Sequence, residues 1–243
     1  MQQLYVVGIG PGEQSGMTLE ADAALQKSDV IIGYTKYIAL VRPYYENKEF
    51  AATGMLQEVD RCKLALEMAA SGRNVAVVCS GDAGVYGMAG LIYELSESFP
   101  TVEIFIVPGV TAALAGGALL GAPLTSDFAV VSLSNLLTPW ERIEKRVACA
   151  AEADFAICIY NPMSKGRPDF LRRACEIMLR YKPADTVCGI AKNIGREGEN
   201  TELTTLAALA DTEVDMFTTV FVGNAQTIVV HGKMVSVRGY QHG

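Results

Sequence analysis

The chain has 243 residues, of which 50% are hydrophobic and 19% are charged. Such a composition supplies a buried core and excludes an intrinsically disordered chain, and the length suits one large domain or two small ones. The formal net charge of −7 argues against a protein that binds nucleic acid regardless of sequence, because such proteins are usually basic.

In the first half of the chain, short apolar runs alternate with segments of helical spacing. The run LYVVG at 4–8 ends in glycine and is typical of a buried strand, and Thr18 is suited to cap the helix that follows. This alternation predicts a parallel sheet with helices on both faces. The expected strands are 4–8, 30–33, 75–79 and 102–107, and the expected helices are 18–27, 56–71, 88–96 and 111–120.

The segment APLTSDF at 122–128 interrupts this pattern with a proline and polar residues. We therefore predict an N-terminal α/β domain of residues 1–121 and a C-terminal α/β domain of residues 122–243, with a ligand in the cleft between them. The last two expected strands are joined by a short link, which predicts a hairpin and a mixed second sheet. The expected strands are 129–133, 155–160, 187–191, 217–222 and 227–230, and the expected helices are 140–151 and 169–180. Residues 204–210 could form either a short helix or a strand.

Three further features bear on the class of protein. Residues 104–126 carry no charge, but their two prolines and four glycines favour a strand, a turn and a buried helix over a membrane span. The N-terminus has no basic region, so we expect no signal peptide. The six cysteines are at least nine residues apart and there are only two histidines, so we expect no metal site and free thiols in a cytoplasmic protein.

The glycine-rich segment at 8–12, GIGPG, follows the first expected strand, where a dinucleotide-binding loop would lie. Glu13 stands where the third glycine of that motif belongs, and Pro11 lacks an N–H for a pyrophosphate. The second expected strand ends at Gly33 and Tyr34 without an acid for a ribose hydroxyl. These departures disfavour a nucleotide-dependent oxidoreductase, which we keep as an alternative, and they equally disfavour a Rossmann-like methyltransferase.

Two other segments end expected strands of the same sheet. CSGDAGVYG at 79–87 combines three glycines with Asp82, whose carboxylate can accept from a ligand hydroxyl or amine. PGVTAA at 108–113 places Thr111 at the start of a helix of small residues, which leaves room for a flat ring. Either segment alone would indicate a tight turn, but together at successive strand ends they favour a ligand site.

In combination, these segments resemble the tetrapyrrole (corrin/porphyrin) methylase family. The blocks at 132–141 and 160–167 are similar to the branch that acts on ring carbon 17 of precorrin-3B or cobalt-factor III, and the likeness slightly favours the cobalt form. The resemblance spans essentially the whole chain. It is carried by VGIGPG at 7–12, SGDAGVYGMA at 80–89, PGVTAA at 108–113, SLSNLLTPWE at 132–141, YNPMSKGR at 160–167, GIAKNIGREGE at 189–199 and FTTVFVGN at 217–224.

The resemblance implies two α/β domains that bind S-adenosylmethionine (SAM) in the cleft between them, release S-adenosyl-L-homocysteine as product and form a homodimer. Residues 104–126 could supply apolar surface for that dimer. The tetrapyrrole trough would include Gly10 and Pro11. The cofactor-binding residues implied by position are Pro11, Gly81, Asp82, Ala83, Thr111, Ala112, Asn161, Gly189, Ile190, Ala191 and Thr218.

The reaction implied by the resemblance is methylation of carbon 17 with contraction of the macrocycle, in cobalamin (vitamin B12) biosynthesis. The sulfonium already activates the methyl group and the macrocycle is the nucleophile, so alignment supplies most of the catalysis. Contraction needs proton transfers. Asn135 stands where the family pattern leads us to expect Asp, which disfavours an acid–base role there. The candidate catalytic residues are Ser132, Ser134, Thr138, Lys192 and Glu197.

The substrate implied by the resemblance carries many carboxylates, whereas the chain is acidic. Lys192 and Arg196 lie in a glycine-flanked segment, and we expect them to meet those carboxylates. The cluster of Lys165, Arg167, Arg172 and Arg173 could do the same, although Arg172 and Arg173 fit solvated surface cations better. Methylation of another ring position, or a tetrapyrrole carrier without catalysis, remain open alternatives. We expect no nucleic-acid partner and no membrane partner.

Overall fold

The computed structural model describes residues 2–240 and divides into two compact units, Met1–Ala112 and Ala113–Gly243. The sequence places the boundary between Gly121 and Ala122, at the other end of helix α5 (Ala112–Leu120). Nearly all of this helix joins the second unit because its small residues pack there: a Cβ built on Gly116 would lie 3.1 Å from the Phe221 ring. The polar, proline-containing segment 122–128, which we expected to be the boundary, therefore lies inside the second unit.

The first unit contains a five-stranded sheet in the order β3-β2-β4-β1-β5. Each pairing in this sheet is parallel among the residues described, which confirms the parallel sheet predicted from the sequence. The inner strands β2 and β4 are almost fully buried, as the apolar runs indicate. The strands are β1 (Gln2–Gly8), β2 (Val30–Tyr34), β3 (Glu49–Thr53), β4 (Val75–Cys79) and β5 (Val102–Val107).

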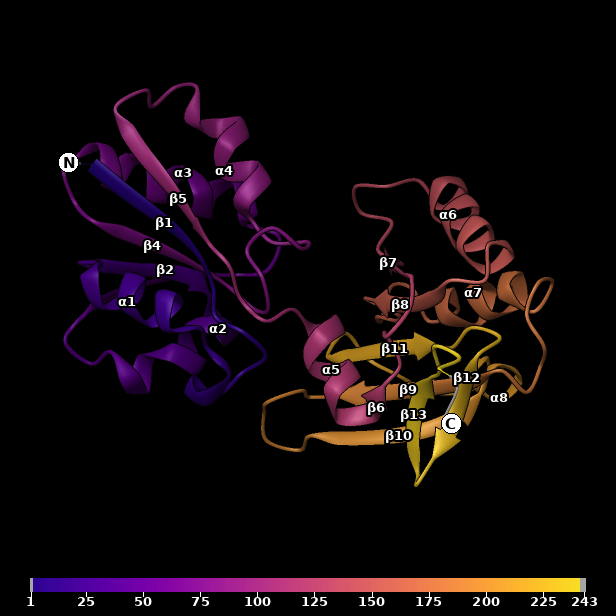
Figure 1. Ribbon diagram of the computed structural model, residues 1–243. Helices are drawn as coiled ribbons and strands as arrows, with labels where there is room; N and C mark the ends of the chain where they lie inside the picture. Colours follow the sequence, from indigo (N-terminus) through magenta and orange to yellow (C-terminus); the bar gives the residue numbers. More distant parts are fainter. Residues whose placement is uncertain (1, 241–243) are drawn as a thin grey trace. The chain divides into compact units, whose positions relative to one another are not determined.

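Helices cover both faces of this sheet, as predicted (Figure 1). On one face α1 (Leu19–Lys27) and α2 (Thr35–Val41) bury a cluster that contains Leu25 and Ile31. On the other face α3 (Glu58–Ala70) and α4 (Ala89–Ser96) bury a cluster that contains Leu66 and Ile92. Thr18 accepts a hydrogen bond from the Ala21 N–H, so its predicted capping role is confirmed. The short 3₁₀ turns are Gln14–Gly16 and Arg42–Tyr44.

The order of the strands creates a switch point between β1 and β4, which are neighbours. After β1 the chain passes through α1 on one face towards β2, and after β4 it passes through α4 on the other face towards β5. The two connections leave in opposite directions, and ligands of open α/β sheets bind outside the carboxyl ends of the strands at such a point. The carboxyl edge of β1 and β4 is therefore where a ligand is expected in this unit.

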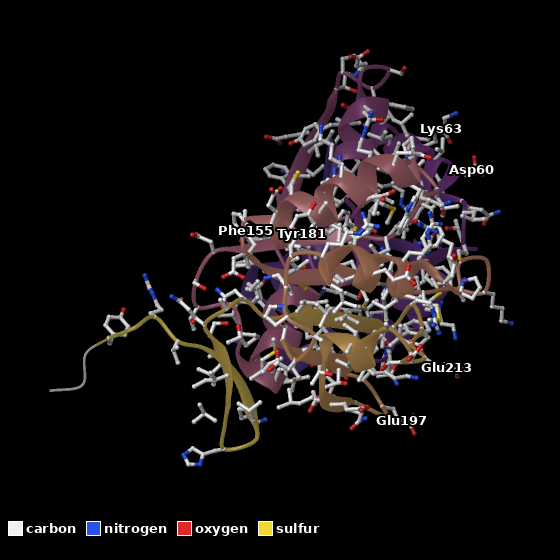
Figure 2. The ribbon with its side chains drawn as sticks, turned by 90° about the vertical axis from the view of Figure 1, so that its right-hand side faces the viewer. Asp60, Lys63, Phe155, Tyr181, Glu197 and Glu213 are labelled. Carbon is white, nitrogen blue, oxygen red and sulfur yellow. The ribbon has the colours of Figure 1, made fainter. Side chains whose placement is uncertain are left out.

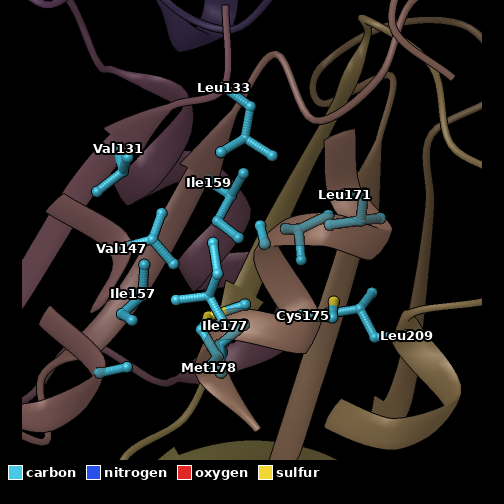
Figure 3. Packing of buried hydrophobic residues seen from close by; sticks show 14 of the residues in the cluster. Val131, Leu133, Val147, Ile157, Ile159, Leu171, Cys175, Ile177, Met178 and Leu209 are labelled. Atoms are coloured by element: carbon cyan, nitrogen blue, oxygen red, sulfur yellow. The ribbon is translucent and has the colours of Figure 1, made fainter. Parts of the chain in front are cut away.

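The second unit contains a five-stranded mixed sheet in the order β10-β9-β11-β8-β7. The strands β7 and β8 are parallel, and β11 runs antiparallel to both β8 and β9, which confirms the predicted mixed sheet. The helices α6 (Trp140–Glu152), α7 (Phe170–Met178) and α8 (Leu206–Leu209) bury one face of it (Figure 3). The strands are β7 (Phe128–Ser132), β8 (Ala156–Tyr160), β9 (Val187–Lys192), β10 (Asn200–Thr205) and β11 (Thr218–Val222).

The predicted pairing of the last two expected strands is wrong. Strand β12 (Thr227–Val230) pairs with β13 (Lys233–Ser236), and β13 pairs with β6 (Gly121–Ala122) in a separate three-stranded sheet. Between β11 and β12, Asn224 donates its N–H to Thr227 Oγ1 at 2.9 Å, which turns the chain away from β11. The ambiguous segment 204–210 is the end of β10 followed by α8.

Two further expectations concern the environment of the chain. No helix within residues 2–240 combines the length and the apolar character that a membrane crossing needs. All six cysteines are free and five of them are buried, in agreement with the expected free thiols. Burial raises the pKa of Cys62 to about 12 and that of Cys79 to about 11, so these thiols stay protonated and unreactive at neutral pH.

Candidate functional site

At the carboxyl edge of the first sheet, the loops after β1 and β4 are joined by two backbone hydrogen bonds. The Gly10 N–H donates to Gly81 O at 3.0 Å, and the Gly81 N–H donates to Gly10 O at 2.8 Å. Both residues have positive φ angles, +71° and +68°, which glycine adopts without strain. The paired turn therefore requires glycine at positions 10 and 81, which explains these two glycines of the sequence motifs.

The loop after β5 packs against the same turn, backbone against backbone. A Cβ built on Gly109 would lie 2.1 Å from Gly81 O and 2.5 Å from Gly8 O. A Cβ on Gly8 would lie 2.7 Å from both Gly109 N and Gly81 O. The loops that follow β1, β4 and β5 thus interlock, with main chain packed directly against main chain, which is possible because glycine has no side chain.

Asp82 connects two of these loops through its carboxylate. Oδ1 accepts hydrogen bonds from the N–H groups of Gly84 at 2.8 Å and Val85 at 3.0 Å, and Oδ2 accepts from the Gly109 N–H at 2.9 Å. The sequence assigns this carboxylate to a ligand, whereas the structure shows that it first organises the site. A carboxylate offers about four acceptor positions, so three backbone donors still allow a ligand hydroxyl or amine.

The remaining site residues predicted in this unit have different surroundings. Ala83 is fully buried in the core beneath α4, so only its main chain can serve a ligand. Pro11 lies against Gly16, where a Cβ would be 3.0 Å from Pro11 Cγ. Thr111 lies beside the paired turn, its Cα 3.5 Å from a Cβ built on Gly81. Pro11, Ala83 and Thr111 therefore lie with Asp82 at the carboxyl edge of the sheet, and Ala112 follows Thr111 in the chain.

In the second unit, Ser132 and Asn161 lie together at the ends of the neighbouring strands β7 and β8. Asn161 Nδ2 donates to Ser132 Oγ at 3.0 Å, and the Ser134 N–H donates to the same oxygen at 3.2 Å. At the end of β8, Tyr160 Oη accepts the Ala113 N–H of α5 at 2.8 Å. This edge is therefore held by side-chain hydrogen bonds, and Ser132, a candidate catalytic residue, acts as an acceptor within it.

Asp215, which the sequence analysis does not single out, organises the adjoining end of β9 and β11. Its Oδ2 lies 2.8 Å from Lys192 Nζ, and its Oδ1 accepts the Thr218 hydroxyl and the Phe217 N–H, both at 2.9 Å. The bond to an N–H two residues ahead is the signature of an Asx turn, which the segment DMFT could have suggested. The charge of Lys192 is thus already paired within the protein.

The acid dependence of this cluster follows from the pKa of Asp215. Burial alone would raise the pKa, but hydrogen bonds from Lys192, Thr218 and the Phe217 N–H together hold it below the usual value. A folded-state pKa below the unfolded one means that the stabilisation is present at neutral pH and lost as the pH falls through the folded-state pKa. Since the pair is half-exposed, we expect Asp215→Asn to lower the free energy of unfolding by at most about 1 kcal/mol at pH 7.

The measurement is the free energy of urea unfolding of wild type and Asp215→Asn from neutral pH downwards. The gap should close as the pH falls below about 4, the ordinary range of an Asp pKa. A gap that persists unchanged in acid would show that the carboxylate charge is not what stabilises this end of the sheet.

The segment Gly189 to Ala191 lies within β9, and its side chains do not share one face. Ile190 is buried in the helix-covered core. Gly189 faces α5, where a Cβ would lie 2.7 Å from Leu120 Cδ1 and 3.2 Å from Met234 Sδ. Packing therefore explains this glycine, and a ligand could reach only its main chain.

We expect Gly189→Ala to lower the free energy of unfolding by about 1–3 kcal/mol, because the added methyl overfills a packed site. The Leu120 side chain can be shortened, so the same change should be milder in a Leu120→Ala background. Urea unfolding of both single variants and the double variant measures this coupling. Strictly additive losses would contradict the assigned contact.

The other predicted cations and proton-transfer groups are scattered. Arg172 pairs with Asp211 at 2.9 Å, and Arg173 stacks on Trp140 at 4.0 Å, in keeping with surface cations. Arg196 lies 5.8 Å from the Phe217 ring centroid, in the same hairpin as the exposed Glu197 (Figure 2). Thr138 is half-buried in the loop before α6, and Lys165 is exposed.

Within residues 2–240, no group of three His, Cys, Asp or Glu side chains could hold a metal ion.

Comparison with known proteins identifies the family. A family model described as Tetrapyrrole (Corrin/Porphyrin) Methylases matches residues 3–210. The chain belongs to the tetrapyrrole methylase family. The resemblance found in the sequence is thereby confirmed, this methylase is a methyl-transferring enzyme, and the alternative of a nucleotide-dependent oxidoreductase is set aside.

Two relatives match this methylase over nearly their whole length. It is 49% identical over 238 residues to a Salmonella typhimurium protein named probable cobalt-factor III C(17)-methyltransferase, covering 98% of this chain and 99% of the relative. It is 38% identical over 231 residues to a Sinorhizobium protein named precorrin-3B C(17)-methyltransferase, covering 93% and 91%. The crystal structure of the methyltransferase CobJ matches with a TM-score of 0.90 at 39% identity, covering 97% and 99%. The predicted α/β fold class is therefore confirmed.

Proposed function

We propose that this methylase transfers a methyl group from SAM to ring carbon 17 of cobalt-factor III and promotes contraction of the macrocycle, in cobalamin biosynthesis. The observation that carries the proposal is the 49% identity to a relative of that name across practically both entire chains. The lower identity, 38%, to a relative named for metal-free precorrin-3B supports the cobalt-containing substrate over the metal-free one.

The carboxyl edge of the first sheet fits the chemistry of SAM. The amino group and ribose hydroxyls of SAM are hydrogen-bond donors that suit the Asp82 carboxylate, which is half-buried beside Gly81. Pro11, Thr111 and Ala112 adjoin this edge, and Ala83 contributes main-chain groups. In the second unit we assign Asn161, Thr218 and the main chain of Gly189, Ile190 and Ala191 to the same ligand, by position in the family motifs.

The protein's part in the first step is chiefly alignment. When bound, SAM supplies an activated methyl group: the carbon–sulfur bond breaks, a ring carbon gives the electron pair of the new carbon–carbon bond, and S-adenosylhomocysteine leaves. Asp82 and the interlocked glycine loops would hold the donor fixed, because three backbone N–H groups orient the carboxylate and the loops pack closely against one another. Gly10 and Pro11 would line the tetrapyrrole side.

For ring contraction, the residues available as proton carriers are Ser132, Ser134, Thr138, Lys192 and Glu197. Ser132 is the best placed of them, since its hydroxyl hydrogen remains to be donated while its oxygen accepts from Asn161. Lys192 and Arg196 are assigned to substrate carboxylates, with Lys192 held by Asp215 rather than free to swing. We further propose a cytoplasmic homodimer that takes a tetrapyrrole as partner and no nucleic acid.

The test is anaerobic incubation of the purified protein with SAM and cobalt-factor III, in parallel with precorrin-3B. Mass spectrometry is expected to show one added methyl group with cobalt-factor III, and visible spectra the loss of the original conjugation. Conversion of precorrin-3B alone would move the proposal to the metal-free branch. Binding of both ligands without any transfer would instead indicate a carrier.

A further inference from the structure

Arg167 is a buried cation on the loop between β8 and α7. It is 9% exposed, its Nη1 donates to Leu133 O at 2.9 Å, and its Nε donates to Ser164 Oγ at 3.2 Å. Its guanidinium also lies 5.8 Å from the Phe170 ring centroid. No carboxylate forms an ion pair with it among residues 2–240. Its two hydrogen bonds are thus made within the protein, and its contact with substrate carboxylates stays a prediction.

The burial of this guanidinium needs an explanation. Desolvation lowers the pKa of Arg167, because taking the charge out of water disfavours it. An apolar side chain of similar volume would fill the same space without that penalty. An arginine differs from such a side chain in its planar fork, which can donate in fixed directions to two segments at once. Here those segments are the loops that follow β7 and β8.

The loop after β7 is held at both ends and exposed in the middle. At its start, Leu133 is fully buried in the core of the second unit (Figure 3). At its end, Trp140 packs against Phe170 with ring centroids 4.5 Å apart. Between these anchors Leu136 is 67% exposed and Leu137 is 98% exposed. The fixed ends thus present a pair of adjacent leucines to solvent.

We propose that Arg167 is a positioning residue for the tetrapyrrole: it holds the loop of residues 134–139 so that Leu136 and Leu137 meet the apolar face of the macrocycle. The inference rests on the proposed function, which supplies a flat ligand with apolar faces and charged edges. The loop starts at the same strand end as Ser132 and is tied to it through the Ser134 N–H. Exposed leucines beside a candidate ligand site fit such a face.

The test compares Arg167→Met with Arg172→Met, a matched loss of an arginine that pairs only with the surface Asp211 among the described salt bridges. We expect Arg167→Met to raise the KM for cobalt-factor III about 10-fold or more, while the affinity for S-adenosylhomocysteine stays within about 2-fold of wild type. Leu137→Ser should shift KM in the same direction. Arg167→Lys should not restore it, since an ammonium cannot bridge both loops as the fork does.

A second measurement does not depend on catalysis. Hydrogen exchange of the amides at 134–138 is expected to accelerate in Arg167→Met and to stay as in wild type in Arg172→Met. Unchanged exchange in Arg167→Met would overturn the positioning role, even if wild type transferred no methyl group and the proposed function itself failed. If Leu137→Ser left KM unchanged but dissociated a dimer, a second copy of the chain would be the partner of the loop, and the macrocycle contact would be refuted.

Discussion

Gly109→Ala is expected to abolish both methyl transfer and binding of S-adenosylhomocysteine. The added Cβ would lie 2.1 Å from Gly81 O and 2.5 Å from Gly8 O, and these are backbone atoms that cannot rotate away. The loops after β1, β4 and β5 would have to separate, and the hydrogen bond from the Gly109 N–H to Asp82 would be lost with them. Isothermal titration with S-adenosylhomocysteine measures the loss directly.

The matched control is Gly90→Ala, in α4 of the same unit. A Cβ on Gly90 meets nothing within 4 Å, and the residue is exposed on a helix. Alanine there should leave binding unchanged and raise the free energy of unfolding by up to about 1 kcal/mol, since alanine favours a helix over glycine by that amount. Normal ligand binding by Gly109→Ala would contradict the interlocked arrangement.

Asp82→Asn is expected to weaken S-adenosylhomocysteine binding about 10- to 100-fold, which corresponds to about 1.4–2.7 kcal/mol. The amide has one oxygen, so it cannot accept from Gly84 and Val85 on one side and from Gly109 on the other. At least one of these backbone N–H groups would then face the side-chain NH₂ group of the variant, and the loops would lose a hydrogen bond to a charged acceptor. Titration calorimetry measures the affinity, and urea unfolding reports the accompanying loss of stability.

Asp60→Asn provides the comparison for this change. Asp60 is an exposed carboxylate in the first turn of α3 (Figure 2), so its loss removes the same charge from the unit without touching the loops. Binding should remain as in wild type, with a loss of stability of about 0.3–1 kcal/mol from the helix N-terminus. Equal binding losses in both variants would show that net charge, rather than the geometry of Asp82, governs affinity.

The buried strands of the first unit could be predicted from sequence because burial on both faces leaves uninterrupted apolar runs. The bounds of β4 agree with the prediction for this reason. Strands β3 and β10 were missed, and both lie at the edge of their sheet with a single neighbour. Their outer surfaces stay solvated, so their residues are mostly exposed or half-buried and give little periodic signal.

The glycine loops of the site could be predicted because a positive φ and close backbone contact both require glycine, which is visible in the sequence. The hydrogen-bond and ion-pair partners of the charged residues are not visible there. Lys192 meets Asp215, and Arg167 meets the carbonyl of Leu133, across gaps in sequence that only the fold closes. The sequence therefore indicates that Lys192 and Arg167 carry charge, but only the fold shows which groups of the protein they contact.

The most direct test of the proposed function is a conversion with SAM labelled with carbon-13 in its methyl group, followed by NMR of the isolated tetrapyrrole. We expect one labelled methyl on ring carbon 17 of a contracted, cobalt-containing macrocycle. A labelled methyl at another ring position would keep the methylase family but contradict the assignment to carbon 17. A product without label would contradict SAM as the donor and with it the proposed methyl transfer.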